Sequence, residues 1–278
     1  MLTWVERLLW LPAVLLWLGA VRSFFRLRQR PRGPDAWLAG LLWAAWLLIL
    51  VSEAGRWMLL GHAPVASYFD SLTFFIFIML AFYLLFQRRM SWPVLGVVTL
   101  PLMALGLTGA LFLPRNAHNF EPFLKNTWLG MHATLSFMAY GGFTLAFLIG
   151  VLYLYQERQL KKKRFSNWYH LMPSLDSLDT VGVRLIGWAF PLLSFGLVSG
   201  AIYAQVAWGS YWNWNAKETW SLITWLIYLA YLLARVAFGW RGRKATLLAV
   251  FGFAAVLVNY FGVNLLWQSP HALTTLGW

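Results

Sequence analysis

The stretch WLGMHATLSFMAYGGFTLAFLIGVLYLY, residues 128–155, holds one histidine and otherwise no acidic or basic side chain. A helix needs about 20 predominantly apolar residues to cross the roughly 30 Å hydrocarbon core of a bilayer, and this stretch exceeds that length. All backbone hydrogen bonds of a helix are internal, so a helix satisfies its polar groups without water. The stretch therefore predicts a transmembrane helix.

Similar apolar runs recur along the whole chain of 278 residues, of which 60% are hydrophobic and only 11% are charged. This composition excludes an ordinary soluble domain, and continuous apolar runs exclude the alternating pattern of an outer-membrane barrel. The predicted spans are residues 2–21, 36–60, 69–86, 92–113, 128–155, 181–207, 219–238 and 246–267. The predicted fold class is all-α, a polytopic membrane protein with about eight transmembrane helices in a single domain, residues 1–278.

The length of the first apolar run and the residues that follow it indicate that it is a retained span. It is longer than the apolar core of a signal peptide, and arginines follow it where a cleavage site would need small residues. The other unusual segment is the connector 156–180, which carries PSLDSLD close to its end. We expect a short surface helix there that leads into the sixth span and is capped by Ser177 or Asp176.

Basic residues are concentrated on alternate connectors, which predicts the orientation of the chain. Connectors of one set contain Arg22, Arg26, Arg28, Arg30, Arg32, Arg88, Arg89, Arg158, Lys161, Lys162, Lys163, Arg164, Arg241, Arg243 and Lys244. Those of the other set contain Arg56, Arg115, Lys125 and Lys217. Short loops rich in Lys and Arg stay in the cytoplasm, so both termini should face outward. The net charge of +13 follows from this topology, and we expect no nucleic-acid partner.

Cysteine is absent, so the chain has no thiol of its own for disulfide exchange, thiolate catalysis or iron–sulfur ligation. Any thiol chemistry must belong to a partner. Histidines are the main candidate metal ligands, and they are His62, His118, His132 and His271 on the predicted outer side and His170 on the inner side. This distribution directs the search for a site to the outer face.

The predicted outer connector WGSYWNWNAKETW, residues 208–220, places five aromatic rings around one acid and one lysine. A connector needs only a few turn residues, so such a concentration of rings indicates a surface for a flat molecule such as haem. His132, early in the fifth span, and His271, after the eighth, are on the same side and could ligate haem iron axially. The alternatives are interfacial histidines bonded to backbone and an ordinary aromatic belt.

Four motifs in order resemble those of the CcsA family, which belongs to the haem-handling proteins with a tryptophan-rich "WWD" signature. They are RWMLLGHAPVASYFDSL, MHATLSFMAYGGFTLAFLIGVLYLYQERQLKKK, WGSYWNWNAKETW and NYFGVNLL with the later His271. The resemblance covers roughly residues 50–271. It distinguishes CcsA less clearly from the related HemX-like proteins, which share most of these features.

The resemblance implies a haem-presenting subunit of a cytochrome c synthase complex in the bacterial cytoplasmic membrane, with the WWD loop outside. It implies haem b as cofactor, a CcsB-like membrane protein as partner, and apocytochrome c with its CxxCH thiols as substrate. The lipid bilayer surrounds the spans. His132 and His271 match the axial ligands. The remaining residues that the resemblance places at the cofactor are His62, Trp208, Trp212, Trp214, Asn215, Lys217, Glu218 and Trp220.

Two positions depart from the family pattern. Asn215 and Ala216 replace the usual Asp-Pro of the loop, which removes a carboxylate, and Leu233 replaces a histidine that many members carry late in the seventh span. Leucine cannot ligate iron, so the resemblance supports the outer site better than a second site within the membrane. The alternative function is a HemX-like regulator of haem biosynthesis acting through a partner. A haem-free transporter would need a polar lining within the spans, but ionisable residues are nearly absent there.

Three further polar residues carry structural expectations. We expect Glu53 and Arg56, three residues apart on one helix, to pair with each other and to brace the site. Asp70 begins the third span, where its charge should favour the helix dipole and cap the helix. For His62, a loop-stabilising hydrogen bond is the alternative to a role at the cofactor.

Overall fold

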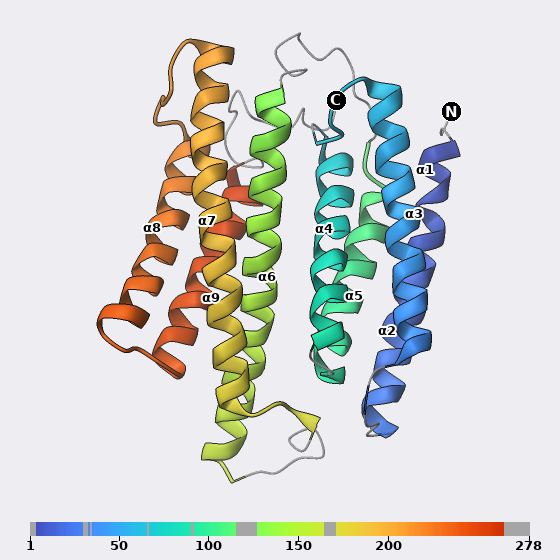
Figure 1. Ribbon diagram of the computed structural model, residues 1–278, viewed down its shortest axis with the longest axis vertical. Coiled ribbons are helices and arrows are strands. Elements are labelled where there is room, and N and C mark those ends of the chain that lie inside the picture. The colour runs from blue at the N-terminus through green and yellow to red at the C-terminus, as the bar shows by residue number, and fades with distance from the viewer. Residues whose placement is uncertain are drawn as a thin grey trace. The chain divides into compact units, whose positions relative to one another are not determined.

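The computed structural model describes residues 4–29, 33, 35–65, 67–89, 92–114, 127–163 and 171–263, and every regular element in these ranges is a helix. The elements are α1 (Trp4–Leu8), α2 (Trp10–Gln29), α3 (Ala36–Leu60), α4 (Tyr68–Arg89), α5 (Pro93–Ala110), α6 (Thr127–Lys161), α7 (Leu175–Trp208), α8 (Ala216–Ala237), α9 (Arg243–Leu257) and the π-helical turn η3 (Val258–Gly262) (Figure 1). Eight of the described segments are long and apolar enough to cross a membrane, with α1 and α2 forming one and α9 and η3 another. The predictions of an all-α fold and about eight spans are confirmed.

The first span differs from its prediction at both ends. It begins as the short helix α1, is interrupted at Leu9, and resumes as α2. Proline lacks a backbone N–H, so Pro12 cannot donate to the carbonyl four residues earlier, and the helix breaks at that point. At the other end α2 continues to Gln29, and Arg26 and Arg28 in its last turn favour the negative end of the helix dipole.

Helices α6 and α7 are much longer than a bilayer requires, with 35 and 34 residues. At 1.5 Å per residue each is about 50 Å long, so each extends well beyond a hydrocarbon core of roughly 30 Å. The helix predicted for PSLDSLD is present and leads into the sixth span, but it is continuous with that span and forms the first turns of α7. Its cap is Ser174, whose Oγ accepts the Ser177 N–H at 3.2 Å, and neither Ser177 nor Asp176 caps the helix.

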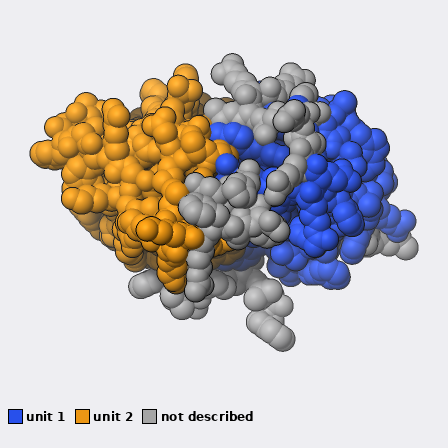
Figure 2. All heavy atoms as spheres, turned by 90° about the horizontal axis from the view of Figure 1, so that it is seen from below, with its two compact units in different colours: residues 1–119, 166–172 blue, residues 120–165, 173–278 orange. Residues whose placement is uncertain are grey.

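Residue contacts divide the chain into two compact units, residues 1–119 with 166–172 and residues 120–165 with 173–278 (Figure 2). In unit 1, α2 packs against α3 and α5, and α4 also contacts both of these helices. In unit 2, α6 pairs with α7 over much of their lengths, and α9 contacts α6 and α8. A single transmembrane domain for the whole chain stays a prediction.

Arg56 connects three helices of unit 1. Its Nη1 atom donates to Glu6 at 2.7 Å and its Nε atom to Asp70 at 2.8 Å, and all three side chains are buried. The predicted Glu53–Arg56 pair is therefore wrong, since Arg56 reaches acids on other helices. Asp70 lies in the first turn of α4, as predicted, where its charge favours the helix dipole. Its predicted role as the cap is wrong, because Ser67 Oγ accepts the Asp70 N–H at 3.0 Å and caps the helix.

Small residues allow α6 and α7 of unit 2 to approach closely. A Cβ atom added to Gly142 would lie 2.8 Å from Ala189 Cβ, and one added to Gly196 would lie 3.0 Å from Ser136 Oγ. Lipid tails are as apolar as leucine, so close backbone packing contributes strongly to helix association in membranes. The α6–α7 contact therefore depends on glycines at these positions.

Asp179 joins α7, α8 and the start of α9. Its carboxylate accepts two hydrogen bonds from Arg235 Nη1, at 2.8 and 2.9 Å, one from Nη2 at 2.9 Å, and one from the Gly242 N–H at 3.2 Å. The Asp179 and Arg235 side chains are only 14% and 11% exposed. A bidentate pair that is this well shielded from water stabilises more than an exposed one.

We predict that Asp179→Asn lowers the free energy of unfolding by about 2 kcal/mol, between the values for exposed and fully buried pairs. Asparagine keeps an acceptor for Gly242, so the loss reports the ion pair. Thermal unfolding of the purified protein in detergent measures it. Asp176→Asn is the control, since Asp176 is an exposed acid on the same helix. Equal midpoints for the two variants would contradict the prediction.

Candidate functional site

The tryptophan-rich connector links two helices of unit 2. Helix α7 ends at Trp208, where Gly209 adopts a left-handed backbone with φ of 74° and donates its N–H to Gln205 O. Glycine reaches this conformation without the steric penalty of a Cβ atom, so it commonly ends helices. The chain leaves the α7 helix at this glycine, so the aromatic residues that follow belong to the connector.

Asn215 and Glu218 fix the backbone where α8 begins. Asn215 is the N-cap, and its Oδ1 atom accepts the Glu218 N–H at 2.9 Å. Glu218 Oε2 in turn accepts the Asn213 N–H at 2.6 Å. The pair resembles a capping box, in which two side chains satisfy free N–H groups at a helix start. An aspartate at position 215 would accept the same bond, so the Asn replaces the family acid without loss of this geometry.

The aromatic rings of the connector pack edge to face. Trp212 and Trp214 have ring centroids 5.8 Å apart and an interplanar angle of 81°, and Trp208 packs against Tyr203 in the same manner. Trp214 is 70% exposed and has a positive φ of 55°, which is uncommon for a residue with a side chain. Trp220, in the first turns of α8, is half-buried. The connector therefore presents aromatic surface to its surroundings.

His132 lies in the second turn of α6 and contacts α7. Its Nδ1 atom is 2.7 Å from the carbonyl oxygen of Gly196. A carbonyl only accepts hydrogen bonds, so Nδ1 must carry the proton in this arrangement. The lone pair is then on Nε2, and no described residue forms a hydrogen bond with that atom. Metal-ligating histidines commonly have such an N–H···O=C bond at the other ring nitrogen, so His132 fits an axial ligand of haem.

Gly200 provides the space that the His132 ring occupies. A Cβ atom added at Gly200 would lie 2.6 Å from Nδ1 and 2.8 Å from Cε1 of His132. The ring is therefore held between the Gly196 carbonyl and the bare backbone of α7. Sequence reasoning missed both glycines. The signal was present, since GLVSG, residues 196–200, has two glycines four residues apart, the spacing typical of closely packed transmembrane helices.

Lys217 supplies positive charge to the same part of unit 2. Its ammonium group is close enough to His132 to act on the ring electrostatically. The side chain is half-buried, and it forms no hydrogen bond or ion pair with any residue of the described ranges. Point charges of this kind pair with carboxylates such as haem propionates. His132 and Lys217 therefore form a candidate haem site beside the aromatic connector.

Two other predicted ligands, His62 and His271, do not belong to the described part of unit 2. His62 belongs to unit 1, where its Nδ1 atom is 3.0 Å from Ala63 O, a bond that fits the loop-stabilising alternative. His271 lies outside the described residues, so its predicted role as second ligand stays a prediction.

Another group missed by sequence reasoning is Asn259 in η3, whose Nδ2 atom donates to Tyr140 and Ser221, both at 2.9 Å. These bonds join η3 to α6 and α8.

Comparison with known proteins is consistent with these motifs. The family model described as cytochrome C assembly protein matches residues 65–271, which includes His132, the aromatic connector and His271. The chain is 35% identical to the cytochrome c biogenesis protein CcsA of Synechococcus elongatus, over 80% of this chain and 82% of that protein.

Two further relatives carry the same name. Identity is 34% to CcsA of Mesostigma viride, over 86% of this chain and 85% of the relative. It is 31% to CcsA of Gloeothece citriformis, over 97% and 94%. The similarity thus extends along nearly the whole chain and is not confined to the connector. The chain belongs to the cytochrome c assembly family, and within it to the CcsA proteins.

Proposed function

We propose that this protein acts in cytochrome c biogenesis by holding haem b at the outer face of the bacterial cytoplasmic membrane and presenting it to apocytochrome c. The observation that carries the proposal is His132, whose protonated Nδ1 is bound to Gly196 and whose Nε2 is left for iron. Haem supplies vinyl groups that form thioether bonds with the CxxCH thiols of the substrate. The chain itself supplies position, charge and exclusion of water.

Each part of the candidate site has a role in this function. His132 and His271 would hold the iron. Lys217 neutralises a propionate, while Trp208, Trp212, Trp214 and Trp220 cover the porphyrin. Asn215 and Glu218 hold the connector in shape, and we assign them no direct contact with haem. Because the chain has no cysteine, the thiols and their reduction belong to other proteins, and a CcsB-like protein is the proposed membrane partner.

The curated relatives described above support this function over regulation of haem biosynthesis, since all three are named cytochrome c biogenesis proteins. The predicted orientation supports it as well. Only a connector on the outer side of the membrane can meet a substrate that matures there, and the sparse basic residues of this connector favour that side.

We predict that His132→Ala, purified in detergent, loses the absorption bands of a six-coordinate haem while protein yield stays normal. The substitution leaves a space shaped like the lost ring, so free imidazole added at millimolar concentration should restore the bands. Thr134→Ala, on the same helix and also half-buried, is the control and should keep its haem. Full haem retention by His132→Ala would contradict the assignment.

Gly200→Ala tests the position of the ring without removing it. The added methyl group would overlap His132, so we expect a several-fold loss of bound haem. Alanine is preferred over glycine in a helix by about 1 kcal/mol, so the helix itself should not be weakened. Gly187→Ala is the matched control, since nothing lies within 4 Å of a Cβ atom added there on the same helix. Equal haem content in the two variants would show that the ring position is unimportant.

Lys217→Gln should weaken haem binding about tenfold, the effect of losing one charge-assisted contact. Lys217→Arg should retain most of the affinity. Titration with haem measures the change, and haem dimethyl ester provides the control because its propionates are uncharged. Wild type and Lys217→Gln should bind the ester equally. A tenfold difference that persists with the ester would place the effect of Lys217 elsewhere.

A further inference from the structure

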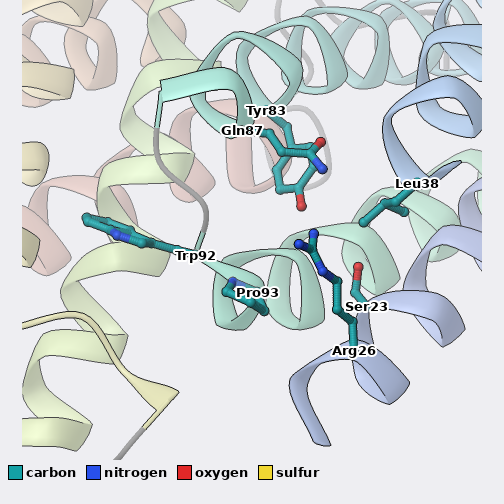
Figure 3. A pocket seen from close by; sticks show the side chains of 7 residues that line it. All are labelled: Ser23, Arg26, Leu38, Tyr83, Gln87, Trp92 and Pro93. Carbon is teal, nitrogen blue, oxygen red and sulfur yellow. The ribbon is translucent and has the colours of Figure 1, made fainter. Parts of the chain in front are cut away.

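A polar hollow lies in unit 1, at the end of the unit where α2 and α4 finish and α5 begins (Figure 3). Ser23 and Arg26 line it from α2, Tyr83 and Gln87 from α4, and Trp92 and Pro93 from the start of α5. The space that it encloses is small, and the hollow is partly open to the surroundings. This is the arginine-rich end of these spans, which the charge pattern assigns to the cytoplasmic side.

Arg26 is the charged group of this hollow, and it is only 7% exposed. Its Nη2 atom donates to Gly33 O, and its Nε atom is 3.7 Å from Asp35. No residue in the described ranges accepts a hydrogen bond from Nη1. The guanidinium points into the hollow, toward the side-chain ends of Tyr83 and Gln87. A buried guanidinium with an unused donor edge is costly unless an acceptor completes it.

Neutral polar groups of the hollow also lack partners. Ser23 is 1% exposed, and its Oγ atom, like Oε1 of Gln87, is buried without a hydrogen bond to any described residue. Gly96 lets the hydroxyls come close together, since a Cβ atom there would lie 2.6 Å from Tyr83 Oη and 2.9 Å from Ser23 Oγ. Buried polar groups are nearly always satisfied by protein, water or ligand. The hydroxyl donors of Ser23 and Tyr83 therefore converge with the Arg26 guanidinium on one small space, and the Gln87 amide oxygen beside them can only accept.

The local charge favours an anion. Burial alone would raise the pKa of Asp35, but the hydrogen bond from the Leu38 N–H and the guanidinium groups of Arg22 and Arg26 hold it below its usual value. The carboxylate is therefore ionised at neutral pH. Arg22 Nε is 3.0 Å from this carboxylate. Two guanidinium groups share one carboxylate, so one positive charge remains uncompensated.

We propose that this hollow binds the phosphate group of an anionic phospholipid. A guanidinium with two hydroxyl donors is suited to phosphate oxygens. The hollow lies at the ends of bilayer-spanning helices, at the depth of the headgroups, and Trp92 has the amphipathic ring typical of that depth. Basic pockets between transmembrane helices on the cytoplasmic side are suited to such headgroups, which are abundant in that leaflet. This site is independent of the proposed haem site, which belongs to unit 2.

The experiment uses the full-length protein, purified in detergent and stripped of lipid, as wild type, Arg26→Gln and Arg28→Gln. Arg28 is the matched control, since it is an exposed arginine two residues along the same helix. Phosphatidylglycerol, phosphatidylcholine or inorganic phosphate is added, and thermal unfolding and native mass spectrometry report binding. We expect phosphatidylglycerol to stabilise wild type and Arg28→Gln. In Arg26→Gln its apparent affinity should fall about tenfold.

Three results would overturn the proposal. Equal stabilisation by phosphatidylcholine would show that the headgroup charge is irrelevant, and equal stabilisation by inorganic phosphate would indicate a site for a free anion. Equal loss in both arginine variants would indicate a diffuse effect of charge. Because Arg26 also binds Gly33, its variant could fail to fold. The variant Ser23→Ala keeps the arginine and should still weaken phosphatidylglycerol binding several-fold, and unchanged binding in it would also contradict the proposal.

Discussion

The hydrogen bond between His132 Nδ1 and the carbonyl of Gly196 depends on the contact between α6 and α7, and the candidate site depends on that bond. Two helices approach this closely only where side chains are small, as at Gly142, Gly196 and Gly200. The same contact therefore brings the ring to its acceptor, leaves room for it, and determines which nitrogen is protonated. Packing of two transmembrane helices thus controls the chemistry of one side chain.

Arg56 in unit 1 and Asp179 in unit 2 are buried charges that are paired in a common way. Arg56 meets acids from two other helices, and Asp179 holds an arginine from α8 and a backbone N–H at the start of α9. A lone charge near hydrocarbon is expensive, so each is neutralised by a partner from elsewhere in the chain. These pairs connect helices that apolar side chains alone would not distinguish, since lipid and leucine are equally apolar. These ion pairs therefore determine which helices are neighbours. The length of an apolar run determines only that a helix can cross the membrane.

The sequence predicted the helical fold and the number of spans, because apolar run length is a local property. It did not predict that Arg56 would bind Glu6, fifty positions away, in place of Glu53, because pairing depends on which helices are neighbours. Ser174 was overlooked as a cap, since several polar residues near it could serve. At the candidate site the motifs indicated His132 and the tryptophan-rich connector. Gly196 and Gly200 contribute by having no side chain, which leaves space for a neighbouring residue. That space became evident only in the packed helices.

The wedged position of the His132 ring has a consequence for how haem would leave the proposed site. A ring fixed by a hydrogen bond at one nitrogen and by backbone contact along one edge has little freedom to swing away from iron. Release of haem from the proposed site would then depend on movement of the haem and not of this side chain. The protein would then act as a rigid holder of the haem that it delivers.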